Sequence, residues 1–378
     1  MKFTKILLAT LSLAFIQSCS NNDDEIIELN KGTLNASYDA TRLKTTTIEP
    51  TISGFENATY TWKLGNEIIG NEKSLGFVSD KAGSYDLTLE IKSLTKTSTL
   101  KTTVKVAQES STYSKYISQV FDYLPAVGQF TNKLPTYVDG DTQTEMTAKA
   151  GKALIGEKPS MITLGGYGGY VVFGFDHTIL NQKDKRDFKV LGNGFAGSSE
   201  PGIIMVAYDK NKNGKPDEDE WYEIAGSEYS NPTTIKNYTI TYHKPAVEDS
   251  KATPEYIKWE DNQGKSGYKA KNTFHKQSYY PLWFGQNQLK FSGSLLANNY
   301  TEKNGIWTGK QLAYGYADNA ANNSEDSNID IDWAVDKNGN PVKLMGIDFI
   351  KVYTATNQEA GWLGEISTEV AGAYDLHL

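Results

Sequence analysis

The stretch Ser84-Tyr85-Asp86-Leu87-Thr88-Leu89-Glu90-Ile91 alternates polar and apolar side chains along its whole length. A strand with one buried face has this period of two, because successive side chains point to opposite faces of the sheet. The same alternation occurs at residues 59–63, Thr-Tyr-Thr-Trp-Lys, and at residues 100–106, Leu-Lys-Thr-Thr-Val-Lys-Val. The three segments therefore predict a sandwich of two sheets in this part of the chain.

The rest of the sequence favours the same fold class. The chain is rich in Tyr, Trp, Thr, Gly and Asn, and helical periodicity is confined to short stretches at 115–120 or 143–154. Apolar runs bounded by Asn-Gly and Pro turns predict further strands at residues 202–208, 221–224, 238–242, 289–291 and 346–353. We predict an all-β protein: an immunoglobulin-type sandwich at 30–107, a polar linker at 108–112, and a larger jelly-roll-like β-sandwich at 113–378.

The N-terminal segment has the organisation of an export signal. Lys2 and Lys5 precede an apolar run at residues 6–16, which is too short to span a bilayer. We expect residues 1–18 to be a signal peptide that is removed. Residues 19–29, which are mostly polar or acidic, would then form a tether.

Cys19 is the only cysteine of the 378 residues, and it follows Phe15-Ile16-Gln17-Ser18. A lone cysteine cannot form an internal disulfide, so the simplest alternative is a buried or reactive thiol. The run resembles the lipobox of bacterial lipoproteins, and the acidic residues 23–25 resemble the surface-export signal of Bacteroidetes lipoproteins. This resemblance implies that fatty acyl chains such as palmitate on Cys19 anchor the protein to the outer membrane, facing the cell exterior.

The charge of the chain excludes one class of partner. The formal net charge is −8, and loss of residues 1–18, which hold two lysines and no acid, makes it −10. Nucleic-acid binding depends on a basic field that displaces the counterions of the phosphates. We therefore expect no nucleic-acid partner.

The segment at residues 30–107 resembles PKD-like, immunoglobulin-type domains. Tyr60-x-Trp62 followed by Gly65 is similar to the strand that carries the core tryptophan of such domains, and residues 82–89 are similar to the turn into their penultimate strand. A tryptophan that alternates with polar neighbours packs between the two sheets, so we expect Trp62 in the core and not in a binding site. The domain would act as a spacer that holds the second domain away from the membrane.

The second domain resembles the C-terminal β-sandwich, or "cell surface protein", domain of Bacteroidetes cell-surface lipoproteins, which usually carry a PKD-like domain in front. The resemblance rests on residues 123–130, 164–170, 173–177, 187–188, 192–193, 199–202, 221–223 and 347–353. It implies an outer-membrane surface protein and transfers no catalytic residue. Some related lipoproteins assist TonB-dependent uptake of glycans or corrinoids, which suggests those ligand classes and a TonB-dependent transporter as partner.

The strongest chemical motif is a twelve-residue loop at 209–220, Asp-Lys-Asn-Lys-Asn-Gly-Lys-Pro-Asp-Glu-Asp-Glu. It has oxygen-bearing side chains at positions 1, 3, 5, 9 and 12, a glycine at position 6 and a backbone carbonyl at position 7, which is the ligand spacing of a calcium loop. The flanking residues alternate as strands, so we expect the loop within a β-hairpin. The predicted ligands of Ca²⁺ are Asp209, Asn211, Asn213, Lys215, Asp217 and Glu220; the alternative is an acidic turn that binds nothing.

A second oxygen-rich segment is less regular. It contains Asp318-Asn319, Asn322-Asn323 and Asp330-Ile331-Asp332, without the fixed spacing of a calcium loop. The following Asp336-Lys-Asn338-Gly339-Asn340 is most simply a hairpin turn centred on Asn338-Gly339.

No motif of a known catalytic class is present. The four histidines do not form a His-Glu-x-x-His zinc motif, and there is no Gly-x-Ser-x-Gly nucleophile elbow. His177, which follows Asp176, could act as a base, although a hydrogen-bonded structural role is the simpler interpretation. A glycosidase needs only two carboxylates at the right separation, and the sequence neither excludes nor locates such a pair.

Aromatic residues are dense between positions 259 and 307. Flat rings with polar edges stack on sugars and planar ligands, although most aromatic residues of a sandwich belong to its core. The run Tyr279-Tyr280-Pro281-Leu282-Trp283 contains a proline and is difficult to bury as a central strand. We therefore predict Tyr280, Trp283 and Trp307 as ligand-binding residues.

These observations lead to one hypothesis and one alternative. We expect an outer-membrane surface lipoprotein, non-catalytic and stabilised by calcium, that binds a nutrient such as a glycan or a corrinoid, or that acts in adhesion. The alternative is a carbohydrate-active hydrolase on the same scaffold. The two differ in whether a bound saccharide is also cleaved.

Overall fold

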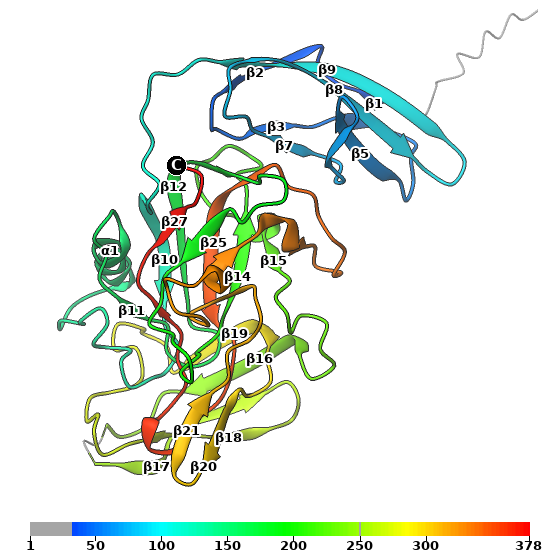
Figure 1. Ribbon diagram of the computed structural model, residues 1–378. Coiled ribbons are helices and arrows are strands. Elements are labelled where there is room, and N and C mark those ends of the chain that lie inside the picture. The colour runs from blue at the N-terminus through cyan, green and yellow to red at the C-terminus, as the bar shows by residue number, and fades with distance from the viewer. Residues whose placement is uncertain (1–31, 249–250) are drawn as a thin grey trace, which may run out of the picture.

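The computed structural model describes residues 32–248 and 251–378, and almost all of the regular structure in these ranges is β (Figure 1). The predicted signal peptide, Cys19 and the tether lie outside the described residues. The all-β, sandwich-type fold class is confirmed. No helix in the described part of the chain is long and apolar enough to cross a membrane.

The N-terminal unit is built on a five-stranded sheet with the order β2-β9-β8-β5-β6, in which β2 and β9 run parallel. Two small two-stranded sheets, β1-β4 and β3-β7, complete it. The three segments with alternating side chains form β5, β8 and β9, as predicted. The strands are β1 (Gly32–Thr33), β2 (Ser37–Thr41), β3 (Thr46–Ile48), β4 (Thr51–Ile52), β5 (Thr59–Leu64), β6 (Glu67–Gly70), β7 (Leu75–Phe77), β8 (Gly83–Lys92) and β9 (Thr97–Ala107).

Trp62 is the centre of the N-terminal core. Its side chain is fully buried, and its indole Nε1 donates a hydrogen bond to the carbonyl of Glu72 at 3.0 Å. The inward-facing residues Leu87, Leu89 and Ile91 of β8 belong to the same cluster. Trp62 is thus a core residue, as its alternating neighbours predicted.

The C-terminal unit is organised around a long antiparallel sheet with the order β10-β12-β25-β14-β15-β24, and β22 pairs with β14 beside this path. The predicted helix at 143–154 is confirmed as α1 (Gln143–Leu154), which packs on β10. In the other candidate helix, at 115–120, residues 119–120 instead begin a strand. The strands are β10 (Gln119–Leu124), β12 (Tyr170–Leu180), β14 (Gly202–Ala207), β15 (Tyr222–Ile224), β22 (Tyr316–Ala317), β24 (Ala334–Val335) and β25 (Gly346–Thr354).

A four-stranded sheet with the order β18-β17-β16-β19 packs against one face of the long sheet. It consists of β16 (Ile235–His243), β17 (Thr253–Asp261), β18 (Ser266–Lys271) and β19 (Gln288–Leu295). A core cluster joins Ile240 and Phe291 of this sheet to Ile203 and Tyr353 of the long sheet. A second cluster, which includes Met146 of α1, covers the other face, so the long sheet is buried on both sides.

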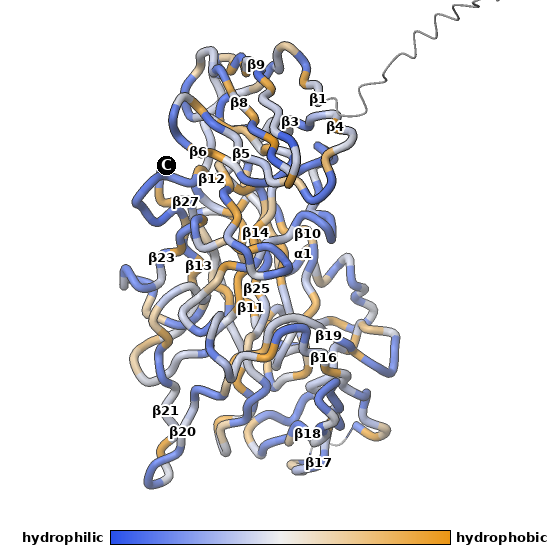
Figure 2. The backbone as a smooth tube through the Cα atoms, turned by 90° about the vertical axis from the view of Figure 1, so that its right-hand side faces the viewer, coloured by the Kyte–Doolittle hydropathy of each residue, from blue (hydrophilic) through white to orange (hydrophobic). Residues whose placement is uncertain are grey.

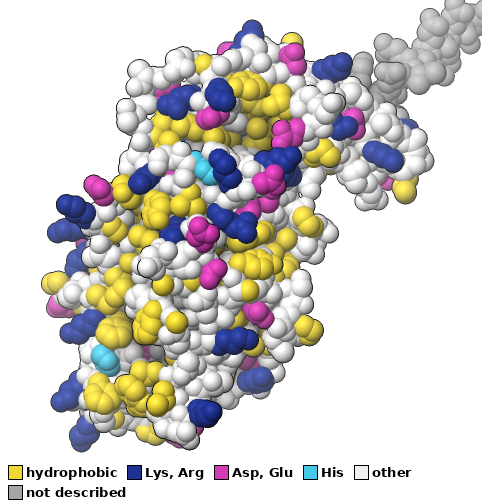
Figure 3. Space-filling view, viewed as in Figure 1, with side chains coloured by type: hydrophobic (Ala, Val, Ile, Leu, Met, Phe, Trp, Pro, Cys, Tyr) yellow, Lys and Arg dark blue, Asp and Glu magenta, His cyan; other side chains and the backbone are white. Residues whose placement is uncertain are grey.

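The remaining short elements cover the ends of this core. They are β11 (Ile162–Thr163) paired with β26 (Glu369–Val370), β13 (Phe188–Val190) between β23 (Asn328–Ile329) and β27 (Ala373–Asp375), the hairpin β20 (Tyr300–Lys303) and β21 (Ile306–Gly309), and the 3-10 turns Glu218–Glu220, Glu325–Ser327, Ile331–Trp333 and Gly361–Leu363. Hydrophobic backbone segments concentrate in the central strands (Figure 2), and charges of both signs are interspersed on the face shown in Figure 3.

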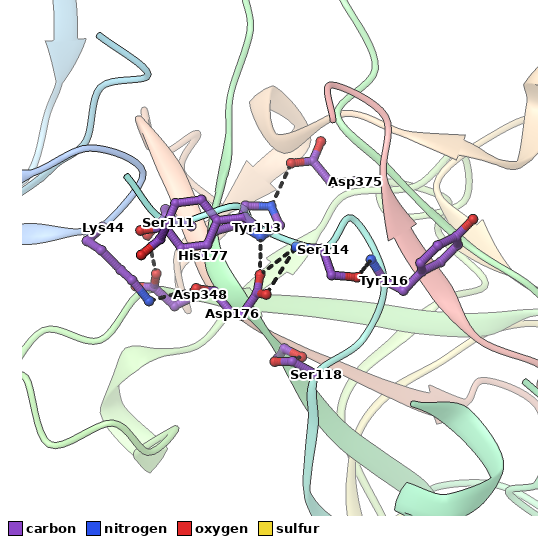
Figure 4. Close-up of polar contacts among 12 residues, drawn as sticks. Lys44, Ser111, Tyr113, Ser114, Tyr116, Ser118, Asp176, His177, Asp348 and Asp375 are labelled. Atoms are coloured by element: carbon purple, nitrogen blue, oxygen red, sulfur yellow. Dashed lines mark hydrogen bonds and ion pairs between the residues drawn. The ribbon is translucent and has the colours of Figure 1, made fainter. Parts of the chain in front are cut away.

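The two units contact each other directly at the upper end of β12. Lys44 Nζ donates to the carbonyl of Asp176 at 2.7 Å (Figure 4). The amide of Thr45 donates to Thr178 Oγ1 at 2.9 Å. The ring of Tyr113, just after the predicted linker, lies 5.6 Å from the ring of His177. The limits of the linker at 108–112 stay a prediction, but these contacts tie the N-terminal unit to the C-terminal one.

Candidate functional site

The predicted calcium loop connects two paired strands. Met205 pairs with Glu223 and Val206 with Tyr222, so the loop lies in a hairpin between β14 and β15, as expected from its flanks. Gly214, at position 6, has a φ of 74°, which a glycine adopts without steric cost. The sharp turn that the motif requires is therefore present.

Most side-chain oxygens of the loop are directed inward. Asp209 accepts hydrogen bonds from the amides of Asn213 at 3.1 Å and Gly214 at 2.8 Å. Asp217 Oδ2 accepts from the amide groups of Asn211 and Asn213, at 2.6 and 2.8 Å. Asn213 Oδ1 accepts from the backbone of Lys215 at 2.7 Å. Glu220 accepts from the amide of Asp217, so all six predicted ligands are linked by hydrogen bonds.

Glu220, at position 12, closes the loop. Its side chain is buried and accepts from the amides of Lys210 at 2.7 Å and Asp217 at 3.0 Å. Burial raises the pKa of this carboxyl group. Among the described residues, one group of acids lies close enough together to share a metal ion, and it is the triad Glu200, Asp318 and Glu369 described below. The acids of the loop are farther apart than that.

Two of the three predicted aromatic platforms belong to the interior. Tyr280 is fully buried, and its hydroxyl donates to the carbonyl of Gln286 at 2.9 Å. Trp283 is half-buried, lies beside the rings of Tyr123 and Tyr137, and donates from Nε1 to Gln143 Oε1 at 3.0 Å. In this conformation Tyr280 offers no ring face to a ligand, and Trp283 is committed to packing between β10 and α1.

Trp307 lies elsewhere, on β21. It is half-buried and packs in a small cluster with Tyr300, Leu363 and Ile366. The structure therefore does not bring the three predicted platforms together. It places Trp307 alone beside a cavity that the sequence did not reveal.

This cavity, called here the acidic pocket, has a volume of about 280 Å³. Its walls combine the apolar and aromatic side chains of Phe130, Leu134, Met161, Tyr300, Leu363 and Ile366 with the polar ones of Gln129, Asn193, Ser198, Glu200, Glu365, Ser367 and Glu369. Tyr300, Leu363 and Ile366 thus connect the Trp307 cluster with the pocket. A concave site with apolar walls and a few convergent polar groups is the usual form of a ligand pocket.

Three carboxyl groups meet at the wall of the pocket, and two of them, Glu200 and Glu369, line it. Glu200, Asp318 and Glu369 each offer an oxygen, and these oxygens lie within 4.8 Å of one another. Burial raises the pKa of Glu200 and of Glu369. The charges of Glu369 and Asp318 raise the pKa of Glu200 further, whereas hydrogen bonds lower that of Glu369. Like charges at this spacing cannot all be ionised, so the group shares protons or holds a cation.

The backbone around Asp318 explains how this group is held. Asp318 Oδ1 accepts from the amides of Asn193 and Gly194, both at 2.7 Å, and Oδ2 accepts from the amide of Glu369 at 2.9 Å. A side chain at Gly192 would collide with the Asp318 carboxyl group, so glycine is required there. Even with these amides, burial raises the pKa of Asp318 to about 8.

Glu365 is the fourth acid of the pocket. It is buried, and its Oε1 accepts from the amide of Gln129 at 2.6 Å. Burial raises the pKa of Glu365 to about 8. Glu369 Oε1 instead accepts from the hydroxyls of Ser367 and Thr163, at 2.6 and 3.0 Å. Buried acids with raised pKa values in a cavity are frequent at functional sites.

His177 has a hydrogen-bonded structural role, which is the simpler of the two interpretations of the sequence. It is buried, and its Nδ1 and Nε2 lie 2.9 Å from the carboxylates of Asp176 and Asp375 (Figure 4). Both ring nitrogens are occupied, so neither is free to act as a base on a substrate.

The acids of the pocket were missed because they come from distant segments. Glu200 precedes β14, and Asp318 follows β22. Glu365 precedes β26, and Glu369 is the first residue of that strand. Asp318 was noted as part of an oxygen-rich segment, and Glu200 lies in one of the stretches that resemble surface lipoproteins. No spacing rule joins these positions, because their proximity arises from the sheet topology.

Comparison with known proteins identifies one part of the chain. Residues 35–93 match the family model of the PKD-like domain. No curated protein matches the chain. Among solved structures, a SusE-like protein is 9% identical over 91% of this chain and 95% of its own, with a TM-score of 0.26.

Two further solved structures are more partial matches. A quinoprotein alcohol dehydrogenase-like protein from Bacteroides thetaiotaomicron is 14% identical over 50% of this chain and 44% of its own, with a TM-score of 0.18. A sialyltransferase from Photobacterium damsela is 20% identical over 19% of this chain and 17% of its own, with a TM-score of 0.16. The chain thus spans less than half of either protein, and likenesses this low support no inference. What is shown is a PKD-like domain at the N-terminal end of the described chain.

Proposed function

We propose that this protein is an outer-membrane surface lipoprotein whose C-terminal unit binds a nutrient glycan in the acidic pocket without cleaving it. The observation that carries the proposal is the pocket itself. Carboxyl groups, amides, hydroxyls and aromatic rings from distant segments converge on one cavity of about 280 Å³. The PKD-like domain would contribute reach, and a TonB-dependent transporter would be the partner that takes up the ligand.

The chemistry of the pocket suits a sugar. Carboxylate oxygens accept hydrogen bonds from vicinal hydroxyl groups, and amide side chains such as those of Gln129 and Asn193 both donate and accept. The rings of Phe130 and Tyr300 line the pocket. Trp307, which packs in the cluster with Tyr300, would offer a further apolar face to the C–H groups of a sugar that extends from the pocket. The volume is at the small end of the range for ligand pockets, so one sugar unit is the expected occupant.

Changing Trp307 to alanine should weaken glycan binding by roughly tenfold, because one stacked ring supplies on the order of 1 kcal/mol. Glycan-array screening of the full mature chain would find the ligand, and calorimetry would then compare the variants. Glu200→Gln should weaken binding as well. Phe274→Ala, which removes an aromatic ring that is 70% exposed outside the pocket, should have no effect. Unchanged affinity in both pocket variants would show that the site lies elsewhere.

Hydrolysis is a second candidate function, favoured by one observation. A carboxyl group with a pKa of about 8, such as Glu365, stays protonated near neutral pH, as a general acid must. The assay is release of reducing ends from any glycan that binds. Loss of release in Glu365→Gln with binding retained would support an enzyme, whereas saturable binding without product supports the binding module.

We also propose that Ca²⁺ occupies the loop at 209–220 and stabilises the C-terminal unit. A ligand that binds only the folded state at 100 times its Kd adds about 2.7 kcal/mol of stability. Chelation with EGTA should therefore lower the melting temperature, and Asp209→Ala combined with Glu220→Ala should abolish that difference.

The turn at residues 336–340 provides a matched control for this experiment. Asp336 Oδ1 accepts from the amides of Asn338 and Asn340, both at 2.8 Å, so the turn has similar local bonds without the calcium-loop spacing. Asp336→Ala should leave the response to EGTA intact. If the wild-type melting curve is the same with and without chelator, the loop is only a hairpin turn.

A further inference from the structure

A second concavity lies on another side of the C-terminal unit. It has a volume of about 620 Å³ and is bounded by strands β14, β15, β24 and β25 of the long sheet and by β16 and β19 of the four-stranded sheet. None of its lining residues belongs to the acidic pocket. We call it the intersheet groove. Its volume falls within the range of about 300–1,000 Å³ that is typical of ligand sites.

Three aromatic side chains line the intersheet groove, and one of them, Tyr353, is buried. Trp221 and Tyr229 are both partly exposed; Trp221 directly precedes β15, and Tyr229 lies in the turn that follows it. Trp221 directly follows the last position of the predicted calcium loop, and Glu218 of that loop also lines the groove. The loop that carries the strongest sequence motif therefore forms part of the wall.

A hydrogen-bonded group orders the side chains around Tyr229. Lys236 Nζ lies 3.1 Å from the centre of the Tyr229 ring and 3.2 Å from Glu223 Oε1. Glu223 Oε2 accepts from Ser294 Oγ at 2.7 Å, and Lys236 Nζ donates to the same hydroxyl at 3.2 Å. Glu223 and Lys236 thus neutralise each other within the groove, and the ring of Tyr229 is backed by a cation.

The charges that line the intersheet groove balance. The acids are Glu218, Glu223 and Asp336, and the bases are Lys236, Lys337 and Lys351. A strongly charged ligand would therefore be repelled by as many charged side chains as attract it. Asn237, Asn338 and the serines of β19 add uncharged donors and acceptors. The groove favours a neutral ligand with many hydroxyl groups.

We propose that the intersheet groove is a second binding site, which takes a segment of a neutral oligosaccharide chain. The inference goes beyond the proposed function, since it holds whether or not the acidic pocket binds a sugar. A peptide is the less favoured occupant, because specific peptide recognition needs apolar pockets for alternate side chains. Met205 and Val335 are the only aliphatic side chains among the described lining residues.

The test uses the full mature protein in affinity gel electrophoresis. Gels containing starch, xylan, glucomannan or galactan are compared with gels containing polygalacturonate or chondroitin sulfate. We expect retardation by at least one neutral polysaccharide. Trp221→Ala and Tyr229→Ala should each weaken it by roughly tenfold, the effect of losing one stacked ring. Trp221→Phe, which keeps a ring, should retain most of the binding and controls for loss of folding.

The outcomes separate this inference from the proposal for the acidic pocket. Retardation that Trp221→Ala removes and Trp307→Ala preserves assigns the polysaccharide to the intersheet groove. The inference is overturned if no neutral polysaccharide retards the protein, or if Trp221→Ala and Tyr229→Ala leave retardation unchanged. It is also overturned if Trp221→Ala and Tyr229→Ala weaken retardation only by the charged polysaccharides. The same holds if these variants lose binding to unfolded casein, a peptide probe, while retardation by every polysaccharide is unchanged.

Discussion

Changing Cys19 to alanine should release the protein from the membrane completely. Acyl chains on the cysteine bind through buried methylene groups, each worth about 0.8 kcal/mol, and two or more chains give stable anchoring. No helix among the described residues is long and apolar enough to cross a membrane. The measurement is fractionation of cells that express the wild type or Cys19→Ala, followed by detection of the protein in the outer-membrane and soluble fractions.

The control for this experiment is Ser20→Ala, which alters the residue next to the acylation position and leaves the thiol in place. It should remain in the membrane fraction and should incorporate labelled palmitate, whereas Cys19→Ala should incorporate none. If Cys19→Ala still sediments with the outer membrane, the lipid-anchor proposal is wrong and another part of the chain holds the protein there.

Alternation of side chains was sufficient to predict the N-terminal unit. A two-residue period reports directly which face of a strand is buried, and Trp62, Leu87 and Leu89 are all in the core. The C-terminal strands at 202–208 and 346–353 were also predictable, because nearly continuous apolar runs are typical of strands buried on both faces. Their order in the sheet was not, since β12, β25 and β14 are neighbours from distant parts of the chain.

Several features of the loop at 209–220 were predictable from the local spacing of its residues. Its motif predicted the inward-facing oxygens, and its flanks predicted the pairing of β14 with β15. The role of Trp221 as part of a groove wall could have been suspected from its position next to Glu220. The opposite wall of that groove, on β16 and β19, depends on the packing of two sheets and has no local signal.

The aromatic run at 279–283 shows where composition is a weak guide. A proline does exclude these residues from a central strand, but it does not prevent burial in a loop. Tyr279 and Tyr280 are covered, and the side chain of Asn132 donates to the carbonyls of Ser278 and Tyr280 at 2.8 and 2.9 Å. Aromatic rings next to satisfied loop backbone pack as well as those on strands, so sequence alone could not separate platforms from core.

The acidic pocket should make the stability of the C-terminal unit fall as the pH rises. Burial raises the pKa of Glu365 and of Asp318 to about 8 in the folded protein, from ordinary values of 4.5 and 3.8. Between about pH 4 and pH 8 the folded state therefore holds protons that the unfolded chain has released. Each group contributes stability that is fully present below the lower pKa and is lost as the pH rises through the upper one.

Glu365→Gln should remove the part of this loss that comes from Glu365, and leave the part that comes from Asp318. Glutamine keeps an oxygen that can accept the amide of Gln129, but it cannot ionise. One pKa unit corresponds to about 1.4 kcal/mol, so the free energy of unfolding of the variant relative to wild type should rise by about 4 kcal/mol between pH 5 and pH 8. Asp318→Asn should change in the same direction. Burial lowers the pKa of Lys269, which is present in all of these proteins, and the charge of Glu365 raises it.

Urea denaturation of the C-terminal transition at pH 5, 6, 7, 8 and 9 measures this difference. Glu56→Gln, which neutralises an exposed carboxylate in the N-terminal unit, is the matched control and should shift stability by the same small amount at every pH. If Glu365→Gln differs from wild type equally at pH 5 and pH 9, the carboxyl group is already ionised in the folded state. A cation in the pocket would then be required to hold it, and the glycan proposal would have to give way to a metal or amine ligand.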